Sequence, residues 1–213
     1  MSYSDFTLQS IEARFGVSAR PAALLPDARP ALVPVWLRAQ LDRGLELPLV
    51  SEKARSELIV MPVLLACREL SADSIAIYSG ARLDVSPEQG LAGECDFLLA
   101  RTLPVPEVRA PLAVIVEAKK NDVEAGLGQC VAQMIGARLL NERAGCGEAP
   151  VFGCVTTGEV WQFLQLDRSV AAIDRRRYYL DDVAGILGAF EAVVARAEGF
   201  RASEIDATMN VHD

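Results

Sequence analysis

The chain has 213 residues, of which 51% are hydrophobic and 23% charged, with a formal net charge of −8 and a pI near 4.8. This length and apolar content suffice for one substantial hydrophobic core. The acidic balance argues against a general nucleic-acid binder, because phosphate contacts need a basic surface, although metal ions at an acidic site would offset part of that charge. We find no apolar run that could span a bilayer and no signal-peptide pattern at the N-terminus, so we expect a cytoplasmic protein that does not enter a membrane.

Cysteine and histidine usage excludes two further classes of site. The five cysteines are odd in number and scattered, and no Cys-x-x-Cys pair occurs, so neither a zinc site nor a disulfide framework is expected. The single histidine, His212, lies next to the C-terminus, which removes histidine-based catalysis and histidine-rich metal sites. The cysteines are Cys67, Cys95, Cys130, Cys146 and Cys154.

The first half of the chain predicts helices before strands. Residues 1–50 are rich in proline and favour short helices over 8–15 and 35–45, which we interpret as an N-terminal extension packed on the core. Ser51 is a candidate N-cap for a helix over 51–70, with Pro62 inside it as a point of kinking or early ending. Strands are expected over 75–85, 93–99 and 112–120.

The second half alternates helices and strands again. A helix is expected over 123–143 and a last amphipathic helix over 182–197, followed by a loose tail, 199–213. The only dense basic run, Arg175-Arg176-Arg177, fits a solvated turn before that helix. We expect Trp161 to fill the core. The remaining strands are expected over 151–158 and 160–166, with an edge strand over 178–180.

The order of elements is helix, three strands, helix, two strands, helix. It predicts an α/β or α+β domain with a central mixed β-sheet between helices, over residues 51–198.

Three charged side chains stand on two of these apolar strands. Asp96 lies on the first, and Glu117 and Lys119 lie two residues apart on the second, so they share a face. A hairpin of the two strands would bring Asp96 beside them. Buried carboxylates are costly unless they are paired or hold a metal, and paired acids on a rigid sheet suit a hard divalent cation. The alternative is that Asp96 accepts turn hydrogen bonds and that Glu117 and Lys119 form a surface ion pair.

This arrangement resembles the PD-(D/E)XK nuclease superfamily, the restriction-endonuclease-like fold. The resemblance rests on Asp96, on the strand carrying Glu117-Ala118-Lys119, and on a following helix with Gln129 and Gln133. It spans about Ser51 to Leu166 and is similar to the N-terminal nuclease domains of type I restriction motor subunits and to a group of uncharacterised bacterial proteins. Cys95 stands where the family name has proline.

The resemblance implies a metal site and roles for its neighbours. Asp96, Glu117 and the carbonyl of Ala118 would hold Mg²⁺ or Mn²⁺, and Lys119 would orient or deprotonate the attacking water, with a lowered pKa, or neutralise the transition state. Glu57, or in its place Glu52, would add a ligand from the first core helix. Gln133 or Gln129 would position the water or a phosphate.

Two functions from different classes follow from the resemblance. The first is a Mg²⁺-dependent deoxyribonuclease acting on DNA, which either needs a protein partner subunit or acts on single strands or ends. Fold analogy adds a homodimer. The second is a catalytically silent nuclease-like fold that serves as an interaction or assembly module. A metal-dependent hydrolase of smaller phosphate esters is a third reading. A cluster of Lys and Arg beside the acidic site would favour the first function.

Overall fold

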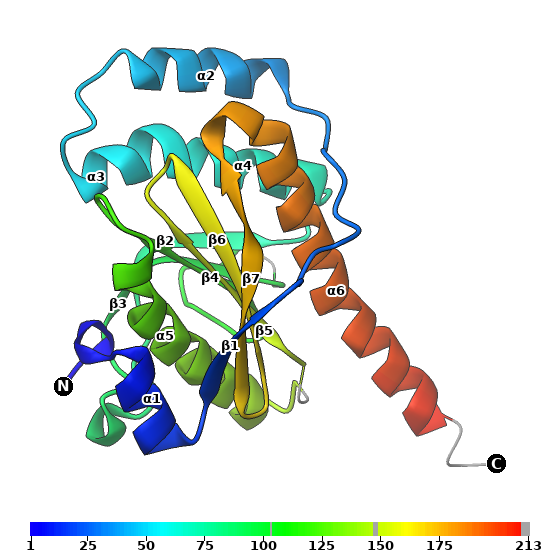
Figure 1. The fold of residues 1–213 in the computed structure, drawn as a ribbon. Coiled ribbons are helices and arrows are strands. Elements are labelled where there is room, and N and C mark those ends of the chain that lie inside the picture. The colour runs from blue at the N-terminus through cyan, green and yellow to red at the C-terminus, as the bar shows by residue number, and fades with distance from the viewer. Residues whose placement is uncertain (103, 147–148, 210–213) are drawn as a thin grey trace.

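The protein is a mixed α/β structure built around one seven-stranded sheet with helices on both faces (Figure 1). The computed structural model describes residues 1–102, 104–146 and 149–209, with the backbone alone from residue 198 on. The strand order is β1-β7-β6-β5-β4-β3-β2. The pairs β1/β7 and β4/β5 are parallel, and the other neighbours are antiparallel, which gives the mixed sheet that the sequence predicts.

The strands are β1 (Ser18–Ala22), β2 (Ala76–Arg82), β3 (Glu94–Ala100), β4 (Leu112–Ala118), β5 (Val151–Thr156), β6 (Val160–Asp167) and β7 (Val170–Tyr179). The helices are α1 (Leu8–Phe15), α2 (Val35–Leu45), α3 (Glu52–Arg55), α4 (Met61–Leu70), α5 (Glu124–Arg143) and α6 (Val183–Met209). A π-helical turn, Ser56–Val60, joins α3 to α4, and Tyr3–Asp5, Pro87–Gln89 and Leu180–Asp182 are 3₁₀ turns.

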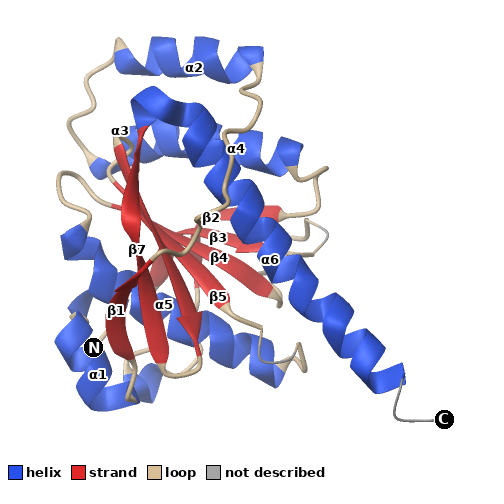
Figure 2. Cartoon of the chain, turned by 45° about the vertical axis from the view of Figure 1, so that its right-hand side comes forward, coloured by secondary structure: helices blue, strands red, loops and turns tan. Residues whose placement is uncertain are grey.

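The central strand β4 is buried on both faces and divides the core in two. Val114 and Val116 face the cluster formed with α2, α4 and α6, whereas Ile115 faces the cluster formed with α1 and α5. Figure 2 shows these two groups of helices on opposite sides of the sheet. A strand covered on both faces reads as a continuous apolar run, which is the pattern of residues 112–116.

Local signals set several helix ends. The Ser51 side chain accepts a hydrogen bond from the N–H of Ala54 at 3.1 Å and caps α3 as predicted. Residues 52–70 follow one continuous helical path, as predicted, and a π-helical turn over Ser56–Val60 interrupts its α-helical hydrogen bonding just before Pro62, where the sequence predicts a kink.

The N-terminal extension contributes a strand that the sequence did not predict. Residues 18–22 pair in parallel with β7, so the extension is part of the sheet as well as a covering layer. Ile11 belongs to one core cluster, and Leu37 and Leu41 belong to the other. Residues 1–50 therefore share the core of the remaining chain.

The region before the last helix corrects two further predictions. Residues 178–180 are not an edge strand, since β7 spans Val170–Tyr179 and lies between β1 and β6. Arg175-Arg176-Arg177 is not a turn but part of β7. The sequence predicts that the last helix ends at Ala197, whereas α6 continues to Met209, across most of the tail predicted to be loose. Residues 210–213, including His212, lie outside the described residues.

Two further predictions concern the packing of Trp161 and the absence of a membrane-spanning helix. Trp161 is fully buried and lies edge-on to Phe190 of α6, with ring centroids 5.9 Å apart, so the prediction that it fills the core is confirmed. Within the described ranges, no helix has the combination of length and apolar character that crossing a membrane requires.

Candidate active site at the end of β4

The site begins where β3 and β4 separate. The ladder between them pairs Phe97 with Val116, and beyond that pair the Oδ2 of Asp96 accepts the N–H of Ala118 at 2.7 Å. The Asp96 carboxylate thus satisfies a backbone donor that a strand partner would otherwise satisfy. A strand residue turns its N–H and C=O to the same side, so the Ala118 carbonyl also faces the β3 side.

Glu117 is the buried centre of the site, with 2% of its surface exposed. Its Oε1 lies 2.7 Å from the Nζ of Lys119, and its Oε2 accepts the Nε2 of Gln133 at 2.8 Å. The same Nζ donates to Oε1 of Gln129 at 3.1 Å. The two glutamines, one helical turn apart on α5, therefore hold the two members of the ion pair separately.

The close approach of α5 to β4 depends on a glycine. A Cβ on Gly126 would stand 2.6 Å from Cγ1 of Val155 and 3.1 Å from Cγ of Lys119. Only glycine leaves room for the Lys119 side chain beneath the first turn of α5. Gly128, two residues later on α5, leaves room in the same way for the backbone of Phe6.

Burial shifts the acids of the site toward their neutral forms. It raises the pKa of Glu117 to about 7, and the nearby charge of Asp96 adds to the shift, whereas Lys119 opposes it. Burial also raises the pKa of Asp96, against the opposing N–H of Ala118 and the ammonium of Lys119. Glu117 therefore changes charge near neutral pH.

Lys119 differs from the expectation of a lowered pKa. Burial by itself lowers the pKa of Lys119, but the carboxylates of Glu117, Glu52 and Asp96 outweigh it and the pKa is raised. The side chain stays an ammonium at neutral pH. In the metal-free protein this charge state suits a fixed positive charge beside the two carboxylates.

The two glutamates of the first core helix take different positions. Oε1 of Glu52 accepts the N–H of Lys120 at 3.2 Å, which ties the start of α3 to the end of β4. The Glu57 side chain is 62% exposed and lies 3.8 Å from Lys53. Glu52 is thus bound to the site directly, whereas Glu57 belongs to its solvent-facing margin.

An open cleft of about 450 Å³ lies beside these residues, between α3 with its π-helical turn and the strands β2 and β3. Phe97 and Gly80 form part of its floor. Four carboxylates line it, those of Glu52, Glu57, Glu94 and Asp96. The cleft gives solvent and a ligand access to Asp96.

The donor set fits a hard divalent cation. Asp96 and Glu117 offer carboxylate oxygens, and the buried Oε1 of Gln133 has no hydrogen-bond partner. In the part of the chain that the structure describes, no three His, Cys, Asp or Glu side chains are grouped as metal ligands. An ion at this place would therefore complete its shell with the Ala118 carbonyl and water.

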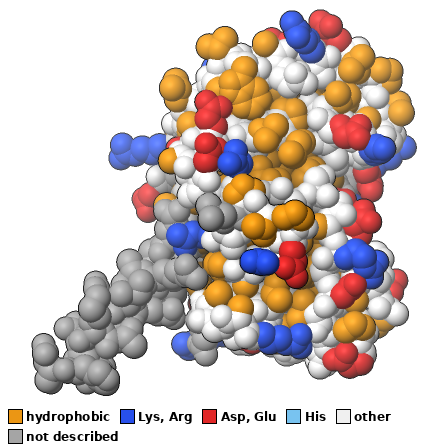
Figure 3. Space-filling model, turned by 180° about the vertical axis from the view of Figure 1, so that it is seen from behind, with side chains coloured by type: hydrophobic (Ala, Val, Ile, Leu, Met, Phe, Trp, Pro, Cys, Tyr) orange, Lys and Arg blue, Asp and Glu red, His pale blue; other side chains and the backbone are white. Residues whose placement is uncertain are grey.

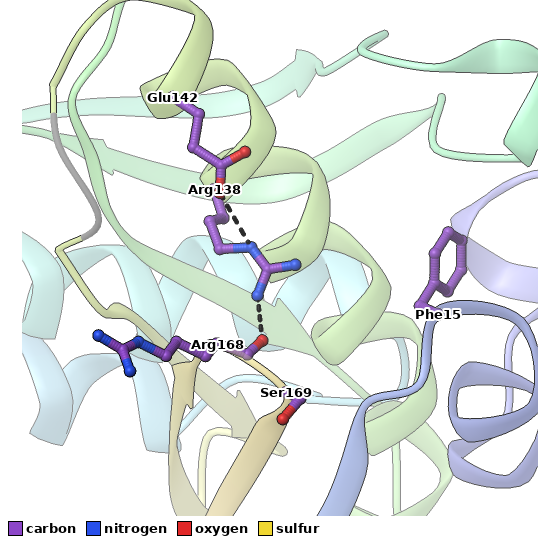
Figure 4. A pocket seen from close by; sticks show the side chains of 5 residues that line it. All are labelled: Phe15, Arg138, Glu142, Arg168 and Ser169. Atoms are coloured by element: carbon purple, nitrogen blue, oxygen red, sulfur yellow. Dashed lines mark hydrogen bonds and ion pairs between the residues drawn. The ribbon is translucent and has the colours of Figure 1, made fainter.

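A second hollow lies at the other end of α5 and is lined by other residues than the candidate site. It has a volume of about 510 Å³ and is lined by Phe15, Arg138, Glu142, Arg168 and Ser169 (Figure 4). Nε of Arg138 lies 3.4 Å from Oε1 of Glu142, and Nη1 of Arg138 donates to the carbonyl of Arg168. None of the predicted site residues lines this hollow.

The structure thus brings together Asp96, Glu117, Ala118 and Lys119 with the two glutamines of α5, and it leaves Glu57 at the margin. Sequence reasoning missed the ion pair between Arg177 of β7 and Glu124, the first residue of α5. The run of three arginines at 175–177 was the sequence feature that could have indicated this ion pair. Comparisons with protein-family models, curated proteins and solved structures find no match to this chain.

Proposed function

We propose that the protein is a Mg²⁺- or Mn²⁺-dependent phosphodiesterase acting on nucleic acid, with a restriction-endonuclease-like fold of the PD-(D/E)XK type. The observation that carries the proposal is the buried carboxylate of Glu117, held at 2.7 Å by Lys119 just past the end of β4, with Asp96 beside it at an open cleft. Buried acids with a fixed ammonium are expensive for folding and typical of sites that do chemistry.

Each residue has a defined task in this proposal. Asp96, Glu117 and the Ala118 carbonyl hold the ion, which supplies an activated water and charge stabilisation. Lys119 neutralises charge that develops on the phosphoryl oxygens. Gln129 and Gln133 keep Lys119 and Glu117 in place through their amides, at 3.1 and 2.8 Å. Glu52 fixes the cleft wall by its bond to the N–H of Lys120.

Calorimetric titration of Mn²⁺ and Mg²⁺ tests the proposal, with cleavage of plasmid and single-stranded DNA read in parallel. We expect wild type to bind metal and cleave, and Glu117→Gln to lose both. Glu107→Gln is the matched control, because Glu107 is 74% exposed and lies in the loop at the opposite end of β4. Wild type that binds no metal at neutral pH or above would contradict the proposal.

The apolar surface around α2 favours a second candidate, an interaction or assembly module. Large hydrophobic side chains are exposed there, and Val35 and Leu32 are 86% and 83% exposed. Trp36, Leu45, Leu47 and Val50 extend this surface. Seen from behind, apolar side chains gather in the upper half of the molecule (Figure 3). Such patches mark protein contacts.

Light scattering of wild type and of Val35→Ser separates the two candidates. An oligomer that dissociates in Val35→Ser while wild type shows no metal-dependent cleavage favours the module. Metal-dependent cleavage by a monomeric variant favours the enzyme.

A further inference from the structure

The only dense basic run of the sequence lies beside the proposed active site. Backbone pairing aligns Glu117 of β4 with Val155 of β5, Val155 with Gln162 of β6, and Gln162 with Arg177 of β7. Directly paired residues put their side chains on the same face of a sheet. Arg177 therefore stands on the face of Glu117, three strands away, or about 14 Å at the usual strand spacing.

Contacts between side chains confirm this alignment. Nε of Arg177 donates to Oε1 of Gln162 at 3.0 Å, and its guanidinium pairs with Glu124 at the start of α5. The same helix supplies Gln129 to Lys119. Arg177 and Lys119 are thus linked to the first turns of one rigid helix.

A wide bulge in β7 displays the neighbouring arginines. Between the pairs Leu164–Ile173 and Gln162–Arg177, β6 has one residue and β7 has three. The buried Gln162 donates to the carbonyl of Arg176 at 3.4 Å and also to that of Asp174, and Asp174 accepts the N–H of Arg176 at 3.2 Å. Bulges of this kind re-aim side chains and are frequent next to active sites.

The three exposed arginines differ in their places and partners, since Arg175 and Arg176 lie in the bulge and Arg177 pairs with Gln162 at its edge. Arg176 lies 4.5 Å above the ring of Tyr178 and 3.9 Å from Asp182. Tyr178 belongs to the core cluster on the face opposite Glu117, so Arg176 lies outside the surface that faces the site. Arg177 is 41% exposed within its pair with Glu124. Arg175 has no ion-pair partner among the described residues. Exposed ion pairs contribute about 0–1 kcal/mol, so a phosphate can replace either carboxylate.

We propose that Arg177, with the exposed Arg175 two residues before it, forms a clamp for the phosphodiester backbone of a nucleic acid whose reacting phosphate lies at the Glu117 site. The inference rests on the proposed function and names the surface that binds its substrate. The span of about 14 Å corresponds to about four steps of 3.4 Å along a nucleic-acid strand. The clamp explains how a chain of net charge −8 can hold a polyanion, since the positive charge is concentrated at one place.

Fluorescence anisotropy with a short labelled DNA duplex and its single strand tests the clamp, in Ca²⁺ so that binding is read without cleavage. For Arg175→Ala/Arg177→Ala we expect affinity to fall about 10- to 100-fold and the slope of log affinity against log salt to shrink by about 2. The charge-matched control, Arg38→Ala/Arg109→Ala, removes exposed arginines of α2 and the β3–β4 loop and should bind as wild type.

Two additional variants distinguish a loss of binding from a loss of the folded structure. Arg175→Glu alters the exposed, unpaired residue and should weaken binding, with an unchanged melting temperature. Arg175→Lys/Arg177→Lys should keep most of the wild-type affinity, because the charge is retained. Equal binding by wild type and Arg175→Ala/Arg177→Ala overturns the clamp.

Hydrolysis of a small phosphodiester, bis(p-nitrophenyl) phosphate, separates failure of the clamp from failure of the proposed function. Metal-dependent hydrolysis without arginine-dependent DNA binding overturns the clamp and keeps the phosphodiesterase. Arginine-dependent DNA binding without any hydrolysis keeps the clamp and overturns the phosphodiesterase.

Discussion

Gln133 donates from Nε2 to Oε2 of Glu117 at 2.8 Å, while its own Oε1 is buried without a partner. A glutamine with no exposed surface that satisfies only half of its amide is unusual in a core. Its free acceptor is available to a proton on Glu117, after rotation of the amide, or to a bound ion. The pair therefore suits a carboxyl that exists in two charge states.

The first prediction concerns stability against pH in the absence of metal. The pKa of Glu117 is about 7 in the folded protein and 4.5 for an ordinary glutamate, so the folded state binds more protons between these values. The free energy of unfolding should fall as pH rises from about 4.5 to 7, by about 3 kcal/mol. Urea denaturation at about pH 5 and pH 8 measures this change.

Glu117→Gln should lose most of that dependence and be the more stable protein at about pH 8. Glu107→Gln, an exposed change of the same kind, should follow wild type. An identical pH dependence in wild type and Glu117→Gln would contradict a shifted Glu117.

The second prediction links metal binding to the same carboxyl. Because an ion binds the deprotonated form of Glu117, the apparent affinity for Mn²⁺ should fall up to about tenfold for each pH unit below 7. Thermal unfolding with and without Mn²⁺ should therefore show a larger stabilisation at about pH 8 than at about pH 5.5. Asp96→Asn should remove the stabilisation, and Glu94→Gln, on the same cleft, should retain it.

The third prediction separates the charge of Lys119 from metal binding. Lys119→Met keeps the length of the side chain and removes the ammonium, so cleavage should fall about 10²- to 10³-fold. Affinity for Mn²⁺ should not fall, since Oε1 of Glu117 loses its 2.7 Å partner. Cleavage assays and calorimetry on one preparation measure both. Cleavage at the wild-type rate by Lys119→Met would remove Lys119 from the chemistry.

The fourth prediction uses two glycines of α5. Gly126→Ala places a Cβ 2.6 Å from Val155 and 3.1 Å from Lys119. The variant should therefore be less stable by about 1–3 kcal/mol and should lose cleavage. Gly128→Ala places its Cβ against the backbone of Phe6, away from Lys119. It should destabilise the fold but keep cleavage in the folded fraction. Equal cleavage per folded molecule by the two variants would show that Lys119 tolerates displacement.

The sequence predicts the central part of the fold because its signals there are local. The apolar runs of β3 and β4 and the long helix α5 follow from residue patterns within one element, and the spacing of Glu117 and Lys119 places them together. The division of work between Gln129 and Gln133 could not be predicted, because both lie on one helix face and only packing decides which reaches Glu117.

The missed elements depend on distant partners. β1 contains Pro21 and two alanines, residue types that disfavour strands, and it forms through its pairing with β7. The arginine run of β7 breaks the apolar alternation that marks a strand, and Gln162 and Asp174 hold Arg175 and Arg176 in a bulge. These side-chain contacts join different strands, so they cannot be predicted from the sequence before the strand pairing is known.

The parallel pairing of β1 with β7 also orders the assembly of the molecule. Ser18 pairs with Val170, so β1 gains its neighbour in the sheet only after β7, the last of the seven strands along the chain, has been made. Contacts of this sequence separation form late and slow folding. The segment 1–50 therefore stays without its sheet partner until β7 has been synthesised, and this edge of the sheet closes only then.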